Sequence, residues 1–283
     1  MKGMIQMKTK KITAACLAVG FALVGTASMI AYAAGNPYEN YKTAVVNTIS
    51  KDNLTANAAV QMKQNGKVIA SGCAVYEKAA DVQYAGVTAD IGGQSVKKEE
   101  YSDGNVKIKS DGSKYSEKNC KDKHKGKELL TPNMIKLAEM AADLFVGDLS
   151  NQFTTNGNTV SVTLNDVQIP EIANTAAAAF TEMNAAKQYD EGKNDLGDVL
   201  MKEFPITQNA KIESVTMDAD ITKGSLSSQN MIIVISGQTS DGEDTKVEIT
   251  VDANITDVGS TSPETINTSS LQKTSSLEND NED

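Results

Sequence analysis

The chain has 283 residues and a formal net charge of −10, from 27 lysines, no arginine and 37 acidic residues. Binding to nucleic-acid phosphates requires clustered cations, so this acidic balance argues against a nucleic-acid partner. Without arginine there are no bidentate guanidinium clamps for phosphate or carboxylate groups. With no tryptophan, five phenylalanines and eight tyrosines, the chain also has little aromatic surface on which sugars or bases could stack.

The first 33 residues have the pattern of an export signal. Lysines precede an uncharged stretch from Ile12 to Ala34, and Ala31-Tyr32-Ala33 is a typical cleavage sequence. We therefore expect residues 1–33 to be removed, and the remainder to work as a secreted protein or at the extracytoplasmic face of the membrane. A retained anchor is the alternative, because the uncharged stretch is as long as the roughly 20 residues that span a bilayer.

The mature chain is predicted to open with a helix and to continue into a β-meander. Asn36-Pro37-Tyr38-Glu39 combines an N-cap, a proline at the first helical position and a capping-box glutamate, and apolar residues recur at helical spacing to about Lys51. From Leu54 to Glu117 apolar residues alternate with polar ones, which indicates antiparallel strands. Two-residue turns are predicted at Asn65-Gly66, Gly92-Gly93, Asp103-Gly104 and Asp111-Gly112.

The later part of the chain mixes helices and strands. After a lysine-rich loop, an amphipathic helix is predicted at about residues 131–147, a hairpin at 153–167 and an alanine-rich helix at about 170–187. Residues 210–254 return to strands. From residue 257 to 283 the chain is an acidic segment rich in Ser and Thr with almost nothing apolar, which predicts a disordered tail.

Turn positions also predict which residues share a face of the sheet. A hairpin turning at Asn65-Gly66 places Cys73 opposite Ala58, on an apolar face with Val60 and Met62. The same rule collects another apolar set on one face: Tyr84, Tyr101, Val106, Ile108 and Tyr115. The fold class predicted for residues 34–256 is therefore α+β, with a curved antiparallel sheet, half-barrel-like, and helices that cover its apolar face.

The order of these elements resembles that of the lipoprotein-carrier family of half-barrels. The likeness lies in an exported chain with an opening helix, a long meander that contains Asp103-Gly104-Asn105 and Lys107 to Tyr115, mid-chain helices and a final strand–turn–strand. The family includes the periplasmic carrier of lipoproteins and the mycobacterial lipid-binding lipoproteins. The resemblance covers about residues 36–256 and implies a sheet closed by helices over an apolar cavity. The carrier's working arginine has no counterpart here, so lipoprotein shuttling itself is not implied.

Two binding surfaces are predicted. Small side chains on the two later helices, facing a tyrosine-bearing sheet, predict an incompletely filled centre that takes an apolar or lipid-like ligand. The residues predicted to line it are Tyr84, Tyr101, Tyr115 and Ile108. The lysine-rich loop is either a solvated loop or a docking surface for an anionic membrane or wall polymer. Its lysines are Lys118, Lys121, Lys123, Lys125 and Lys127.

Catalytic and metal motifs are weak in this chain. His124, the only histidine, lies among lysines that would not orient its imidazole as a catalytic triad requires, and with Cys120 it supplies only two of the four ligands of a structural zinc site. Ser95 and Lys98 match an S-x-x-K motif, but on a strand they point to opposite faces. We therefore predict no catalytic residue, no metal site and no cofactor.

An aspartate pair and a cysteine are two further candidates for metal binding or cross-linking. Asp218 and Asp220 lack the glycine and glutamate spacing of a calcium loop. Cys73 is predicted to be a buried, reduced core residue, the alternative being a disulfide with Cys120. Three functions remain, in order of preference: an exported, non-enzymatic protein that binds an apolar or lipid-like ligand, a cell-envelope interaction or sensor module with a packed core, and an enzyme of unrecognised type.

Overall fold

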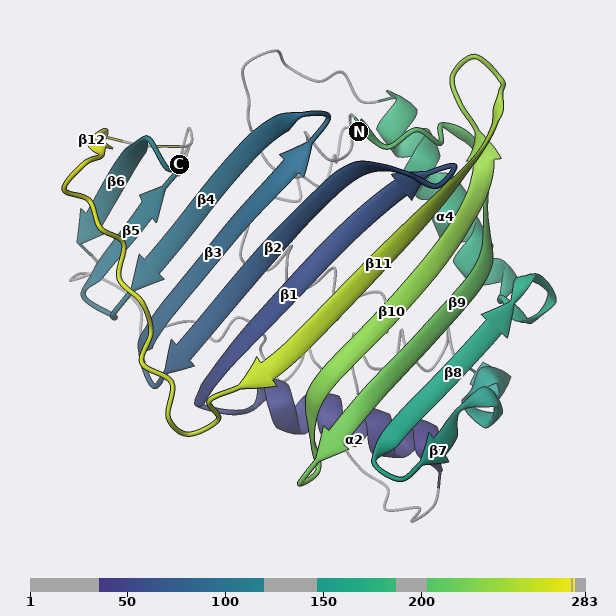
Figure 1. The fold of residues 1–283 in the computed structure, drawn as a ribbon, viewed down its shortest axis with the longest axis horizontal. Helices are drawn as coiled ribbons and strands as arrows, with labels where there is room; N and C mark the ends of the chain where they lie inside the picture. Colours follow the sequence, from purple (N-terminus) through teal and green to yellow (C-terminus); the bar gives the residue numbers. More distant parts are fainter. Residues whose placement is uncertain (1–35, 120–146, 187–202, 276, 278–283) are drawn as a thin grey trace, which may run out of the picture.

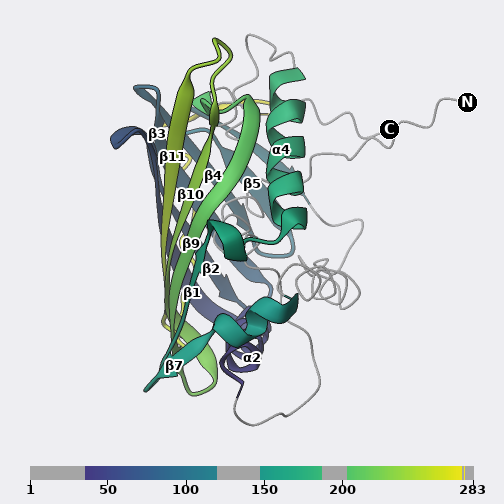
Figure 2. The same cartoon turned by 90° about the vertical axis from the view of Figure 1, so that its right-hand side faces the viewer.

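The computed structural model describes residues 36–119, 147–186, 203–275 and 277. In these residues twelve strands form one sheet, and two α-helices lie on one of its faces (Figures 1 and 2). The strand order is β12-β6-β5-β4-β3-β2-β1-β11-β10-β9-β8-β7. All pairs are antiparallel except β12 with β6, and β12 and β7 form the two edges, so the sheet is mixed and does not close into a barrel. The predicted α+β class is thus confirmed, with the sheet dominating.

The strands and helices have the following bounds. The first six strands are β1 (Asn53–Gln64), β2 (Lys67–Ala79), β3 (Val82–Ile91), β4 (Gln94–Ser102), β5 (Val106–Ser110) and β6 (Lys114–Asn119). The others are β7 (Thr154–Asn156), β8 (Thr159–Asn165), β9 (Gln208–Thr222), β10 (Ser225–Gln238), β11 (Asp244–Thr256) and β12 (Gln272–Lys273). The helices are α2 (Pro37–Ile49) and α4 (Glu171–Ala186), with short 3-10 turns η1 (Gly147–Gln152) and η2 (Asp166–Gln168). The predicted helix at about 131–147 lies almost entirely outside the described residues.

Helix α2 begins where the sequence predicts. The side chain of Asn36 accepts a hydrogen bond from the Tyr38 backbone N–H at 2.9 Å, and Pro37 occupies the first turn, where its missing N–H costs nothing. The helix ends at Ile49, and its last turn is bonded to β10, because Thr48 Oγ1 accepts from the Leu226 backbone N–H at 2.8 Å. These capping and docking contacts fix the helix across the ends of β8–β10. No helix among the described residues is long and apolar enough to cross a bilayer.

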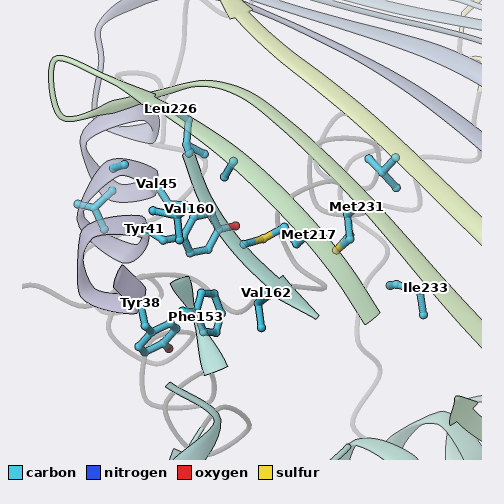
Figure 3. Packing of buried hydrophobic residues seen from close by; sticks show 14 residues of the cluster. Tyr38, Tyr41, Val45, Phe153, Val160, Val162, Met217, Leu226, Met231 and Ile233 are labelled. Carbon is cyan, nitrogen blue, oxygen red and sulfur yellow. The ribbon is translucent and has the colours of Figure 1, made fainter. Parts of the chain in front are cut away.

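The larger core cluster lies between α2 and strands β8–β11 (Figure 3). The rings of Tyr38 and Tyr41 of α2 pack against that of Phe153, with centroids 5.0 and 6.3 Å from it. Tyr41 is 1% exposed, and its hydroxyl donates to Gln229 Oε1 at 2.8 Å. Burial raises the pKa of the Tyr41 hydroxyl strongly, so this group stays a neutral donor inside the core. Apolar burial of this kind is the main stabilising term for such a sheet and helix pair.

A second core cluster lies on the same face beneath α4. Phe204 and Ile206 pack with Met62, Ile91 and Val247 from three strands. Helix α4 joins this cluster through Phe180, whose ring meets that of Phe204 edge-on at 6.0 Å. The start of the helix is bonded to the sheet as well, because Asn174 Oδ1 accepts from the Ile212 backbone N–H at 2.8 Å. The alanine-rich helix predicted at about 170–187 is therefore confirmed.

The predicted meander is present as β1–β6, with most turns at the predicted residues. Tyr84 pairs with Tyr101 as predicted. The next two hairpins are each shifted by two residues, so that Tyr101 pairs with Ile108 and Ser110 with Tyr115. A shift of two keeps every side chain on its predicted face, because side chains alternate with a period of two along a strand. The predicted set of Tyr84, Tyr101, Val106, Ile108 and Tyr115, called the tyrosine row below, therefore shares one face of the sheet, although two of its predicted pairings were wrong.

The predicted register of the first hairpin is wrong beyond its turn. A β-bulge places Ile69 as an extra residue between the pairs Lys63–Val68 and Met62–Ala70, so Cys73 pairs with Ala59 instead of Ala58. This one-residue shift turns Cys73 to the opposite face, away from the core of Val60 and Met62. Cys73 is exposed with a free thiol, and the prediction that it is buried is wrong.

The two faces of the sheet are covered differently from the prediction. Both helices lie behind the sheet of Figure 1, whereas the tyrosine row shares the opposite face with Cys73 and Glu77. That face is crossed by residues 257–275, the segment whose composition predicted disorder, drawn in yellow in Figure 1. Thr261 and Ile266 of this segment are both 8% exposed. The face that carries the tyrosine row is therefore crossed by the chain's own C-terminal segment, which bonds Glu77 and Glu117 at the two ends of that row, whereas the helices lie on the other face.

Candidate functional site

A hollow of about 360 Å³ lies on the face of the sheet opposite the helices, over β1–β4 and β11. Small-molecule sites usually have volumes from about 300 to 1,000 Å³, so the hollow suits a small ligand. Two rows of paired residues cross it. The first runs Asp252, Ala59, Cys73, Thr88, Lys97, and the second runs Asn254, Asn57, Val75, Gly86, Glu99.

The hollow exists because two small residues lie side by side on adjacent strands. Ala59 of β1 and Cys73 of β2 form its floor, while longer polar side chains from β4 and β11 and the Tyr84 phenol over Gly86 form its walls. Side chains on one face of a sheet stand roughly perpendicular to it, so a group of short ones between long ones leaves a depression. The position depends on the bulge at Ile69, which brings Cys73 rather than Ala74 to this face.

One wall of the hollow is built around Tyr84. The Tyr84 hydroxyl donates to Glu99 Oε1 at 3.1 Å, and Lys97 Nζ lies 3.1 Å from the same oxygen. The phenol lies close over Gly86, where a Cβ atom would be only 2.8 Å from the hydroxyl oxygen. Burial raises the pKa of Tyr84 strongly, and the negative charges of Glu99, Glu264 and Glu77 raise it further. The wall is therefore a neutral phenol bonded to a carboxylate that is also paired with an ammonium group.

The opposite wall carries amides. Asn57 of β1 pairs directly with Asn254 of β11, and both side chains are exposed on the hollow's side. Neither amide has a hydrogen-bond partner among the described residues, so each offers a donor and an acceptor. Asp252, next to them, accepts from the Asn230 side chain. The site thus combines hydrogen-bonding groups with both charge signs, a set suited to a polar ligand.

The structure separates the residues predicted to line the ligand site. Tyr84 lies in the wall of the hollow, whereas Tyr101 and Ile108 continue its row across β4 and β5, beyond the hollow. Tyr115 lies on β6, between β5 and the edge strand β12, where Lys273 Nζ is 5.7 Å from the centre of its ring. The row of Tyr84, Tyr101 and Ile108 is continuous, but it is not a cavity beneath the helices.

The predicted docking lysines lie mostly outside the described residues. Only Lys118 is described, as an exposed residue near the end of β6. Lys121, Lys123, Lys125 and Lys127 fall in the segment 120–146, as do His124 and Cys120. The surface-docking prediction therefore stays a prediction.

Other sequence motifs have structural explanations in the described part of the chain. Ser95 and Lys98 lie on opposite faces of β4, as predicted for a chance match. Asp220 accepts hydrogen bonds from Thr159 and Ser228, and these bonds lower the pKa of its carboxyl. No group of three or more His, Cys, Asp or Glu side chains among the described residues could hold a metal ion.

Sequence reasoning missed most of the residues around the hollow: Asn57, Lys97, Glu99, Asp252 and Asn254. Their alternation along strands could have placed Lys97 and Glu99 on one face of β4. The pairing of β1 with β11, by contrast, joins the two ends of the domain and leaves no local signal in the sequence.

The position of Cys73 gives a first testable prediction. In a Cys120→Ser background, the Cys73 thiol should react with a small maleimide in the folded protein at close to the rate seen in urea, because Cys73 is exposed and free. Mass spectrometry of the labelled protein measures both rates. Labelling that is slower by orders of magnitude in the folded protein would mean that Cys73 is buried and that the bulge at Ile69 is absent.

Comparison with known proteins does not assign a family. No protein-family model matches the chain, and no curated protein matches it at a significant level.

Proposed function

We propose that this is an exported, non-enzymatic binding protein that holds a small polar ligand in the hollow between Asn57, Asn254 and Glu99. The observation that carries the proposal is the pair of amides, Asn57 and Asn254, which have no partner among the described residues and lie beside a hollow of about 360 Å³. A hydroxyl- or amide-bearing ligand would satisfy both. The export pattern of residues 1–33 supports an extracytoplasmic place of action.

The chemistry of the walls argues for binding rather than for turnover. Glu99 is already engaged by Tyr84 and Lys97, and Asp252 by Asn230, so these charges hold the walls in place. Such engaged groups give orientation and specificity to a ligand at little cost, because they do not reorganise when it binds. The nearest alternative is a protein-interaction module without a small ligand. Such a module would bind its protein partner on the same polar face.

A second candidate function is the binding of an apolar or lipid-like ligand on the helix side of a half-barrel-like sheet. The observation in its favour is that Ala58 and Ala74, at the centre of that side, are only half-buried and belong to neither core cluster. A floor of small apolar side chains would suit an acyl chain, and filling it would relieve the cost of poor packing. A fluorescent fatty-acid analogue that binds and raises the melting temperature would support this function instead.

The proposed polar site can be tested through its own thiol. In the Cys120→Ser background, Cys73 labelling is followed while chitobiose, maltose or glycyl-serine is added at millimolar concentration. A bound compound should slow the labelling of Cys73, because that thiol is part of the floor, and should raise the free energy of unfolding by about 2.7 kcal/mol at a hundredfold excess over Kd.

A matched pair of variants separates the hollow from the rest of the face. Ala59→Phe fills the floor and should abolish the protection, whereas Gln61→Phe adds the same ring two residues along the same face of β1, outside the hollow, and should leave it intact. If none of the three compounds protects Cys73 or raises the melting temperature, the polar-ligand proposal fails.

A further inference from the structure

The C-terminal segment is anchored to the sheet at both of its ends. At its start the Asn53 side chain accepts from the Thr261 backbone N–H at 2.8 Å and donates to the Thr261 carbonyl at 3.0 Å. At its end the Gln272 N–H bonds the Ser113 carbonyl at 3.1 Å and Lys273 pairs with Glu117 at 2.7 Å. The segment between these anchors therefore spans β1 to β6 as a bridge.

The middle of the segment contacts the wall of the hollow. The Glu264 backbone N–H donates to Glu77 Oε2 at 2.6 Å, and Glu77 is the residue of β2 paired with Tyr84. Ile266, the buried apolar residue of the segment, is 8% exposed, and Tyr84 is 6% exposed. Tyr84 stands in one cross-strand row between Glu77 and Glu117, the two carboxylates that bond the segment, and its hydroxyl reaches Glu99 in the hollow.

We propose that residues 261–273 form a strap that holds Tyr84 in place as the wall of the hollow, and that release of the strap opens the hollow into the neighbouring row of Tyr101 and Ile108. This inference rests on the proposed function, since it describes the control of the same site. With the strap closed the hollow has polar walls; with the strap open the same site continues into an aromatic surface. The strap is therefore a device that selects between two ligand chemistries at one position.

The composition of the strap suits reversible closure. It is a mostly polar segment, and its attachment consists of a few hydrogen bonds, one surface ion pair and one buried isoleucine. Elements with few buried apolar contacts open at lower free energy than the core of the protein, so the strap should open without unfolding of the sheet.

Modification of Tyr84 tests the strap in the full-length protein without any ligand. Ile266→Asp should release the segment, because an unpaired carboxylate is far costlier in a buried position than in water. Nitration of Tyr84 by tetranitromethane, located by peptide mass spectrometry, should then rise at least about tenfold. Val258→Asp is the matched control, since Val258 is 50% exposed and lies before the first anchor, and it should leave Tyr84 protected.

A second variant covers the case in which Ile266→Asp does not fold. Asn53→Ala removes both side-chain bonds to Thr261 while keeping the buried isoleucine, and should raise Tyr84 nitration in the same direction by a smaller factor. Hydrogen exchange of residues 260–274 reports whether the segment has been released. If hydrogen exchange shows that the segment is released but Tyr84 is still not nitrated, the strap inference is overturned and the polar-ligand proposal stands. Failure of ligand protection at Cys73, with Tyr84 newly nitrated, would overturn only the polar-ligand proposal.

Discussion

Replacing Tyr41 with alanine should lower the free energy of unfolding by about 3–5 kcal/mol, the range found when large aromatic core residues are truncated. The reason is the position of its ring, 1% exposed between α2 and the sheet and 6.3 Å from the ring of Phe153. Truncation leaves a cavity at the centre of the larger core cluster (Figure 3) and removes the hydroxyl bonded to Gln229. Domains of this kind are typically stable by only about 5–15 kcal/mol, so the variant should be close to unfolding at 37 °C.

Urea unfolding followed by far-ultraviolet circular dichroism measures this loss. The control is Tyr41→Phe, which keeps the ring and removes only the hydroxyl, and which should cost about 0.5–1.5 kcal/mol for the lost hydrogen bond. A loss below 1 kcal/mol for Tyr41→Ala would contradict the packing of α2 against β8–β10, because only an undocked helix would tolerate the truncation.

Local features of the sequence were sufficient to predict the elements around Tyr41. The cap at Asn36 and the proline at position 37 act on neighbouring residues, so the start of α2 could be predicted without knowledge of its partner strands. The turns at Asn65-Gly66 and Gly92-Gly93 are local in the same sense, because glycine at positive φ is required within the turn itself. These features determine most of the order of elements in β1–β6.

The hollow could not be predicted in the same way, because it depends on one bulge and one long-range pairing. A two-residue turn predicts register only while the ladder is regular, and the extra residue at Ile69 breaks this condition four residues before Cys73. The pairing of Asn57 with Asn254 brings together strands from opposite ends of the domain. Neither feature leaves a periodic signal in the sequence.

The C-terminal segment shows a different limit of composition-based prediction. Few apolar residues usually mean that a segment cannot offset the entropy of ordering. Here the sheet supplies the partners, because Asn53 makes paired hydrogen bonds with Thr261, and Glu77 and Glu117 bond residues further along the segment. Composition counts the apolar residues that a segment itself contains. It does not include the hydrogen-bond partners that a neighbouring surface supplies.

Gly86→Ala should destabilise the protein by about 1–3 kcal/mol, the usual cost of overpacking, and should displace Tyr84 from the wall of the hollow. A Cβ at position 86 would lie 2.8 Å from the Tyr84 hydroxyl oxygen and 3.2 Å from a methyl carbon of Val75. The backbone of Gly86 is not in the left-handed region, so the effect should come from this contact rather than from backbone strain.

A double-mutant cycle with Tyr84→Phe isolates the contact. Tyr84→Phe alone should cost about 1.5–3 kcal/mol, because it removes a hydrogen bond to the charged Glu99. In the double variant the hydroxyl that meets the new methyl group is absent, so the combined loss should be smaller than the sum of the two single losses by about 1 kcal/mol or more. Urea unfolding gives all four free energies. Strict additivity would contradict the close packing of the Tyr84 phenol over Gly86, and with it the position of the wall on which both the polar site and the strap depend.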